Sequence, residues 1–212
     1  MRPVGEGADG PTTALFGGTF DPIHVAHLVM AEQVGEAAGL ERILFVPAGR
    51  PPHKEGGTFA PPHHRRAMVE LAVSENPRFF VSGIELEADG PSFTIDTVRR
   101  LKAAGAGRVA LIIGGDSLVE MSTWREPEAL LAECELLVVE RPGVDLARAP
   151  ASYRARARVV PALKLDIASR TIRARVAAGQ SIRYLVPEPV RAYIEEHGLY
   201  RNGASGRSAR GE

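Results

Sequence analysis

The sequence predicts an α/β fold in which a doubly wound parallel sheet forms a single domain. Short apolar runs of strand length alternate along the chain with longer segments of helical periodicity. Several helical segments are followed by a glycine that can end a helix, as at Gly39, Gly105, Gly179 and Gly198. The 212 residues and their 44% hydrophobic content suit one sizeable core. Alternation of this kind is typical of a Rossmann-like sheet covered by helices on both faces.

Five apolar runs are the expected strands, because continuous apolar runs suit strands that are buried on both faces. They span residues 13–16, 42–46, 79–81, 109–113 and 136–139. The expected helices span residues 25–38, 62–74, 94–104, 127–133, 169–178 and 187–197, so the C-terminal part is helical. Ligands of such sheets bind at the carboxyl ends of the strands. We therefore expect the chemistry in the loops that follow Phe16, Val46 and Ile113.

Composition narrows the class of protein. Lysine plus arginine and aspartate plus glutamate number 26 each, so no net charge recruits nucleic acid or an anionic membrane. The single cysteine, Cys134, excludes an internal disulfide and a cysteine-based zinc cage. No apolar run reaches the roughly 18 residues of a membrane span, and residues 1–11 lack the apolar stretch of a signal peptide. Residues 1–11 and 202–212 are expected to be flexible tails of a cytoplasmic domain spanning residues 12–201.

An anion-binding segment, GGTFDPIHVAH at residues 17–27, follows the first expected strand. Gly17 and Gly18 let the backbone approach a phosphate closely, and the amide groups that begin the next helix attract negative charge. Asp21 and Pro22 suit the N-cap and the first helical position. The segment matches neither a Walker loop nor the dinucleotide fingerprint G-x-G-x-x-G.

Two histidines in this segment, His24 and His27, lie three residues apart and should share one helix face. Because they share that face, they can bind one anion together. In the alternative interpretation, the glycines form a tight turn and the histidines are ordinary polar surface. Metal ligation is a minor alternative, because no third ligand lies nearby in the sequence.

A second anion site is expected near the other end of the chain, at IASRTIR in residues 167–173. Ser169 is a suitable helix cap. Arg170 and Arg173 lie at the positive end of the expected helix, where cations are disfavoured unless an anion compensates them. A phosphate would do so. The alternative is a solvated basic face that continues through Arg175.

Further candidate residues lie at the other expected loops. The loop PPHK at residues 51–54 ends in the donor Lys54, and residues 91–97 (PSFTIDT) lead into a helix whose amide groups suit a carboxylate or phosphate. Asp116 could accept a ribose hydroxyl or simply cap a helix. Trp124, the sole tryptophan, could pack in the core or stack on a flat aromatic substrate.

Residues 17–27 resemble the GGTFDPxHxGH signature of the nucleotidyltransferase superfamily, with Ala26 in place of the last glycine. The resemblance implies that His24 and His27 bind the ATP phosphates and stabilise the transition state at the α-phosphorus.

Residues 167–173 resemble the I-S-S-T-x-x-R triphosphate motif of the same superfamily. Ser169 and Arg173 are in register, whereas Ala168 replaces a serine and Arg170 a threonine. Two hydroxyl groups are therefore lost, and Arg170 could supply a charge-assisted contact instead.

The remaining segments resemble those of bacterial nicotinate-nucleotide adenylyltransferases. These are PPHK, PSFTIDT, the IIGGDS run at residues 112–117, Trp124, RPG at residues 141–143, and the closing LVPE to GLY stretch at residues 185–200. The resemblance covers residues 14–201. It implies transfer of the adenylyl group of ATP to nicotinate mononucleotide, which yields nicotinate adenine dinucleotide and pyrophosphate. Phe93 stands where that family usually has tyrosine.

Residues and resemblance together predict a site with three parts. The catalytic residues are His24, His27, Lys54 and Arg173. The ATP-binding residues are Gly17, Gly18, Thr19, Phe20, Asp21, Gly114, Asp116, Ser169 and Arg170. The residues that bind nicotinate mononucleotide are Ser92, Phe93, Thr94, Trp124 and Arg141. Mg²⁺ is the expected cofactor, held mainly through ATP phosphates and water, and no metal-ligating residue is assigned.

Several alternatives stay open. The acceptor could instead be nicotinamide mononucleotide or phosphopantetheine, and Ala168 with Arg170 leaves open a catalytically silent nucleotide sensor. A nucleic-acid-binding module is disfavoured because no basic-aromatic stripe is present. We expect a monomer or a homodimer. Histidines 63, 64 and 197 match no motif and are expected to be solvated, and Cys134 to be a small buried residue.

Overall fold

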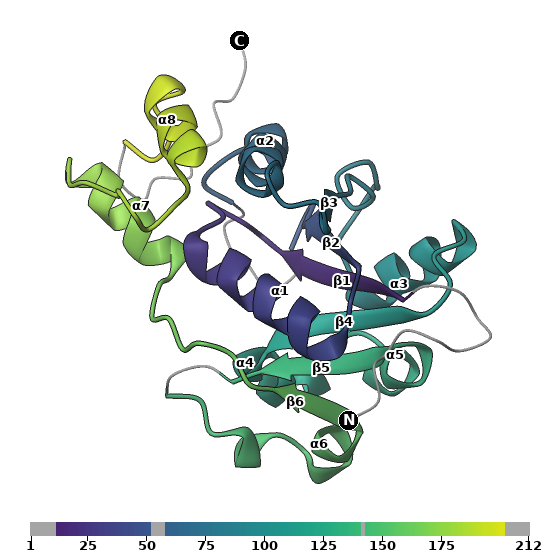
Figure 1. The fold of residues 1–212 in the computed structure, drawn as a ribbon. Helices are drawn as coiled ribbons and strands as arrows, with labels where there is room; N and C mark the ends of the chain where they lie inside the picture. The colour runs from purple at the N-terminus through teal and green to yellow at the C-terminus, as the bar shows by residue number, and fades with distance from the viewer. Residues whose placement is uncertain (1–11, 52–57, 141–142, 202–212) are drawn as a thin grey trace.

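Parallel strands form a six-stranded sheet at the centre of the protein, in the order β3-β2-β1-β4-β5-β6 (Figure 1). This computed structural model describes residues 12–51, 58–140 and 143–201. The register places Leu15 of β1 beside Leu44 of β2 on one side and Leu111 of β4 on the other. The strands are β1 (Thr13–Gly18), β2 (Arg42–Pro47), β3 (Phe79–Val81), β4 (Val109–Gly114), β5 (Glu135–Val139) and β6 (Ala157–Val160). The predicted parallel sheet is confirmed.

Helices cover both faces of the sheet, and Figure 1 shows α1 crossing one of them. Successive strand residues point to opposite faces, so Leu15 and Phe16 enter different hydrophobic clusters. Phe16 packs in the cluster of α1, α2, α7 and α8, and Leu15 in that of α3, α4 and α5. The helices are α1 (Val25–Ala38), α2 (Pro62–Val73), α3 (Thr94–Ala103), α4 (Gly115–Glu120), α5 (Pro127–Glu133), α6 (Ala151–Arg156), α7 (Ser169–Ala177) and α8 (Glu188–Glu196). In the part that the structure describes, none of them is long and apolar enough to cross a bilayer.

One strand and two α-helices were not expected from the sequence. β6 is an edge strand whose Arg158 interrupts the apolar pattern, and α4 and α6 are only six residues long. The expectation that Asp21 caps the first helix is wrong. The helix begins at Val25 with His24 as its N-cap, because the Asp21 carboxylate instead accepts hydrogen bonds from the amides of Phe59 and Ala60.

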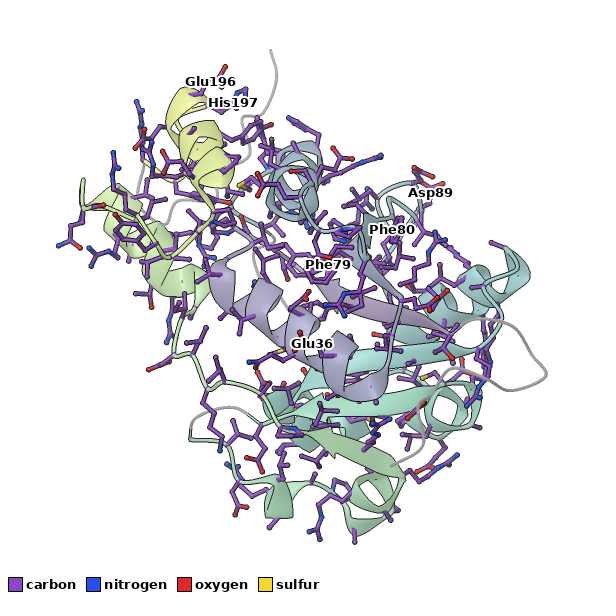
Figure 2. All side chains as sticks on the ribbon, viewed as in Figure 1. Glu36, Phe79, Phe80, Asp89, Glu196 and His197 are labelled. Carbon is purple, nitrogen blue, oxygen red and sulfur yellow. The ribbon has the colours of Figure 1, made fainter. Side chains whose placement is uncertain are left out.

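The short strand β3 lies at one edge of the sheet, and Figure 2 labels two of its side chains, Phe79 and Phe80. Phe79 is buried and packs 5.1 Å, centroid to centroid, from Phe45, whereas Phe80 is exposed. The guanidinium of Arg42 lies 4.6 Å from the centre of the Phe80 ring. An exposed aromatic residue on an edge strand is thus partly covered by a cation.

Three histidines that match no motif gather where α2 faces α8. His63 and His197 are exposed, as expected. His64 is half-buried, and its Nδ1 lies 2.9 Å from the Tyr193 hydroxyl. Burial, together with the neighbouring histidines, lowers the pKa of His64. The expectation of a solvated residue therefore fails for His64 alone.

Cys134 ends α5 as a half-buried residue packed against the second hydrophobic cluster. Its Sγ donates a hydrogen bond to the Leu130 carbonyl at 3.2 Å. Burial raises the pKa of the thiol to about 11.

Because the thiolate is the reactive form, we expect Cys134 in the native protein to react with a disulfide reagent at pH 8 at least about tenfold more slowly than in the unfolded chain. Timing thiol release in buffer and in urea, with Cys134→Ser as the blank, tests this; equal rates would contradict it.

Candidate active site

A cavity of about 500 Å³ opens at the carboxyl ends of β1 and β4, the central pair of strands in the sheet. This is where ligands bind in open parallel sheets, because the connections leave these strands toward opposite faces. The sequence-predicted residues that line it are Gly17, Gly18, Thr19, Phe20, His27, Ser92, Thr94, Gly114, Asp116, Trp124 and Ser169. Three loops far apart in the sequence therefore meet at one cavity, as expected.

The glycine pair ends β1 and does not form the turn itself. A Cβ atom on Gly17 would meet nothing within 4 Å, so the cavity is open at this point of the backbone. A Cβ atom on Gly18 would lie 2.9 Å from the Phe20 ring. Phe20 makes the turn, with a left-handed φ of 49°, while its buried ring packs against Phe16 and Phe45. Only glycine combines this open backbone with the close ring contact.

Asp21 belongs to the wall behind the cavity and is not among the residues that line it. Its carboxylate accepts hydrogen bonds from the amides of Phe59 and Ala60, at 2.8 and 3.1 Å, and from the Tyr200 hydroxyl at 2.8 Å. Burial and the Asp21 charge raise the pKa of Tyr200, which therefore remains a donor. The structure thus gives Asp21 contacts that position the loop.

The two signature histidines stack on each other with ring centres 3.7 Å apart. The His24 amide donates to Nδ1 of His27 at 3.3 Å, and the His27 amide donates to the His24 carbonyl at 3.0 Å. An accepting Nδ1 selects the tautomer that carries its proton on Nε2. His27 lines the main cavity, whereas His24 is buried and lines a small adjoining cavity with Glu140 and Lys164.

The expected supply of amide groups at the start of α1 is reduced. The Val25 amide donates to the Leu185 carbonyl at 3.0 Å, and the His27 amide is bonded to His24. The amides of Val25 and His27 are therefore already bonded within the protein.

Helix α7 reaches the same wall through two of its side chains. The Ser169 hydroxyl donates to the Pro22 carbonyl at 2.9 Å and lines the cavity. Arg173 donates to the Asp21 carbonyl at 2.6 Å, and its guanidinium lies 4.0 Å from the centre of the Phe59 ring. Arg173 thus lies behind the cavity wall without lining it, and Arg170 is exposed away from it.

Three of the residues predicted to bind the acceptor, Ser92, Thr94 and Trp124, also line the cavity. The Ser92 hydroxyl accepts from the amides of Gly49 and Arg50, at 2.9 and 3.1 Å, which joins the loop after β2 to the start of α3. Half-buried Trp124 lines the cavity. Phe93 does not line it and lies beneath the Arg125 guanidinium. Lys54 and Arg141 lie outside the described residues.

Sequence reasoning missed Arg65, which is fully buried at 0% exposure. Its guanidinium donates to the carbonyls of Thr19, Gly49 and Ala60, at 2.8, 3.2 and 3.3 Å. Burial lowers its pKa, and the nearby Asp21 charge opposes that shift. Helical periodicity could have indicated that Arg65 is buried. It lies three and four residues before Met68 and Val69, and therefore on the same buried face of α2.

Glu85 and Arg125 also line the cavity and were missed. Burial raises the pKa of the Glu85 carboxyl, which accepts a hydrogen bond from the Thr97 hydroxyl at 2.6 Å. Glu85 lies in the irregular chain between β3 and α3, where no periodicity distinguishes it from neighbouring acids. Arg125 follows Trp124 directly and bears the one permanent positive charge among the described side chains that line the cavity.

Comparisons with known proteins place this geometry in context. Residues 15–178 match the model of the cytidylyltransferase-like family. A probable nicotinate-nucleotide adenylyltransferase of Symbiobacterium thermophilum is 46% identical over 91% of this chain and 96% of its own. A similarly named protein of Thermus thermophilus is 45% identical over 88% of this chain and 98% of its own.

The fold also matches a solved structure. Nicotinic acid mononucleotide adenylyltransferase of Plasmodium falciparum, complexed with NaAD, superposes with a TM-score of 0.75. The match covers 90% of this chain and 97% of that one, at 19% sequence identity, and it therefore concerns the fold.

Proposed function

Since the chain belongs to the nicotinate-nucleotide adenylyltransferases within the cytidylyltransferase-like family, we propose that it transfers the adenylyl group of ATP to nicotinate mononucleotide. The products are nicotinate adenine dinucleotide and pyrophosphate, a step of NAD biosynthesis. The observation that carries the proposal is that one cavity is lined by the open backbone of Gly17, by His27 and by Trp124. It therefore offers a place for phosphates next to a flat surface for a pyridine ring.

The reaction forms one bond and breaks another at the α-phosphorus of ATP. A phosphate oxygen of the mononucleotide bonds to that phosphorus, and the bridging oxygen leaves with its electron pair as part of pyrophosphate. The attacking phosphate is already ionised, so no side chain has to remove a proton. The protein accelerates such a transfer mainly by aligning the reactants and by stabilising charge on the phosphoryl oxygens.

The residues at the first loop suit that task. The Nε2–H group of His27 can donate a hydrogen bond to a phosphoryl oxygen, and the stacked His24 and the bond to Nδ1 fix the ring orientation. Ser169 lines the same cavity, and its hydroxyl would have to rotate from the Pro22 carbonyl to donate to a phosphate oxygen. Arg173 acts on the loop itself, because it contacts the carbonyl of Asp21. We assign transition-state stabilisation to His27 and loop positioning to Arg173.

Mg²⁺ fits this site as a companion of ATP. Among the described residues, no group of three His, Cys, Asp or Glu side chains converges to hold a metal ion. Phosphate oxygens and water would therefore provide most ligands, with Asp116 as one of the two carboxylates that line the cavity. An ion held there would neutralise charge on the phosphates of ATP.

A pyrophosphate-release assay tests the proposed function. Purified protein, ATP and Mg²⁺ are combined with nicotinate mononucleotide, nicotinamide mononucleotide or phosphopantetheine. We expect release with nicotinate mononucleotide to be the fastest. Preference for another acceptor would overturn the assignment, and ATP binding without any release would establish a nucleotide sensor.

Arg173→Ala should chiefly weaken ATP use, because the loop loses its contact at the Asp21 carbonyl and its cover over Phe59. We expect the KM for ATP to rise about tenfold, in line with the loss of a charge-assisted hydrogen bond. The matched control is Arg175→Ala on the same helix, whose guanidinium contacts the Ser181 carbonyl. An unchanged KM and an unchanged rate for Arg173→Ala would count against this role.

A further inference from the structure

Arg125 stands apart among the charged groups at the cavity. The other described side chains with a formal charge there are the acids Glu85 and Asp116, apart from the titratable His27. Arg125 directly follows Trp124, and both residues line the cavity together with Ser92 and Thr94. A permanent positive charge therefore lies at the end of the cavity that we assign to the pyridine ring.

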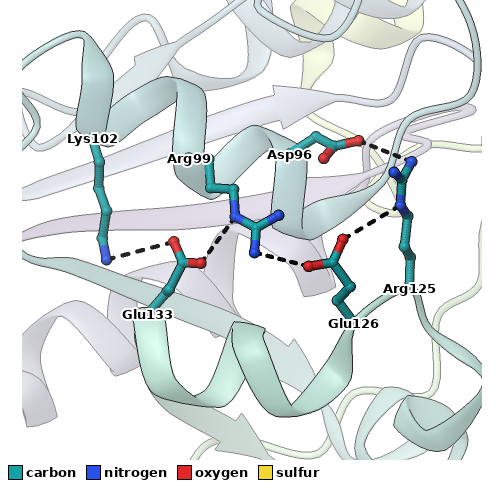
Figure 3. A network of polar contacts seen from close by, with 6 residues as sticks. All are labelled: Asp96, Arg99, Lys102, Arg125, Glu126 and Glu133. Carbon is teal, nitrogen blue, oxygen red and sulfur yellow. Dashed lines mark hydrogen bonds and ion pairs between the residues drawn. The ribbon is translucent and has the colours of Figure 1, made fainter.

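A network of ion pairs holds this guanidinium in place, as Figure 3 shows. Asp96 of α3 lies 3.5 Å from Nη1 of Arg125, and Glu126 lies 3.7 Å from its Nε. The network continues from Glu126 to Arg99 at 2.9 Å, and from there to Glu133 at 2.9 Å. Arg125 thus lies between Asp96 and Glu126 in a chain of charges that links α3 to α5.

The distances show that Arg125 is positioned without being closely neutralised. Glu126 is nearer to Arg99, at 2.9 Å, than to Arg125, and both acidic contacts of Arg125 exceed 3.4 Å. The Arg125 side chain is half exposed. Its guanidinium also lies 4.9 Å from the centre of the Phe93 ring, which restricts its orientation. Enough of its charge therefore remains available to a substrate anion.

The backbone reinforces this placement. The Trp124 amide donates to the Met121 carbonyl at 3.0 Å, and Glu126 adopts a left-handed φ of 49° just before Pro127 begins α5. A non-glycine residue in that conformation is uncommon and is held by its surroundings. The turn lets Glu126 face Arg99 while its neighbour Arg125 faces Asp96.

We propose that Arg125 is a specificity-determining residue, whose guanidinium favours a pyridine mononucleotide with a ring carboxylate over one with a ring carboxamide. Backbone amides can donate to the oxygen of either substituent and therefore discriminate less between them. A fixed positive charge attracts the carboxylate and gains little from the neutral carboxamide. This inference rests on the proposed function, because it assigns the acceptor to the Trp124 end of the cavity.

Isothermal titration calorimetry tests the inference without requiring turnover. The wild-type chain and Arg125→Met, which keeps an unbranched apolar stem, are titrated separately with nicotinate and nicotinamide mononucleotide. We expect the Kd for the acid to rise about tenfold in the variant and the Kd for the amide to change less than twofold. Arg125→Lys keeps the charge and should recover part of the preference.

Kinetics and a matched control complete the test. The acid-to-amide ratio of kcat/KM should fall by the same factor in Arg125→Met, mainly through KM. Lys102→Met removes a cation at the far end of the same network, where it pairs with Glu133 and does not line the cavity, and it should leave the ratio unchanged. If Arg125→Met binds both mononucleotides equally more weakly, or keeps the acid-to-amide ratio of kcat/KM, the role of Arg125 is overturned and the proposed function stands. Failure of the wild-type chain to bind either mononucleotide would overturn the proposed function as well.

Discussion

Replacing His27 with alanine should lower turnover at least about a hundredfold while the fold is retained. His27 lines the cavity, and its ring is fixed by stacking on His24 and by the hydrogen bond that Nδ1 accepts. A donor held in place before the reaction needs no reorganisation as charge develops on the phosphoryl oxygens. Loss of one such donor typically costs a factor of about 10² to 10³ in kcat.

Steady-state pyrophosphate release measures this effect, and circular dichroism checks that the variant is folded. The matched control is His63→Ala, since His63 is exposed on α2 and does not line the cavity. That variant should turn over at the wild-type rate. Near-normal turnover of the His27 variant would refute the catalytic assignment, whatever the behaviour of the control.

The largest effect on stability is expected for Arg65→Met. The substitution leaves the carbonyls of Thr19, Gly49 and Ala60 without their guanidinium donor in a buried place. A buried acceptor that loses its partner costs about 1–3 kcal/mol, so three of them should lower the free energy of unfolding by at least about 3 kcal/mol. That is about a fifth or more of the stability of a typical domain.

Urea unfolding of Arg65→Met and of Arg66→Met provides the test. The adjacent Arg66 is exposed and pairs with Glu70 at 2.8 Å, so its loss should cost no more than about 1 kcal/mol. Arg65→Lys should recover little, because an ammonium group cannot reach three carbonyls as a planar guanidinium does. Similar urea midpoints for the Arg65 and Arg66 variants would show that the three buried hydrogen bonds of Arg65 stabilise the fold no more than a surface ion pair does.

Much of the fold could be predicted from the sequence, because strands that are covered on both faces form uninterrupted apolar runs. β4 reads VALIIG and was placed to within one residue, whereas β6 reads ARVV and was missed because an edge strand needs less apolar sequence. The six residues of α4 complete too few turns to show periodicity. The local pattern of apolar residues therefore predicts the buried strands and helices, but not the short or exposed ones.

The candidate site was predictable where topology alone decides proximity. The ends of β1 and β4 must meet in a parallel sheet of this order, so Gly17 and Gly114 had to line a common cavity. The direction of a side chain depends on tertiary packing instead. For that reason Asp21 and Arg170 were assigned to ATP binding, and Arg173 to catalysis, from their positions, although their side chains do not line the cavity.

The bond between Tyr200 and Asp21 has a consequence for translation. It joins positions 179 residues apart, and the Asp21 loop also needs Arg173. A nascent chain that has emerged from the ribosome only as far as β5 has the whole glycine segment but neither of these contacts. Competence to bind the triphosphate should therefore arise late, when the last helical turns have been synthesised, so an incomplete chain would sequester little cellular ATP.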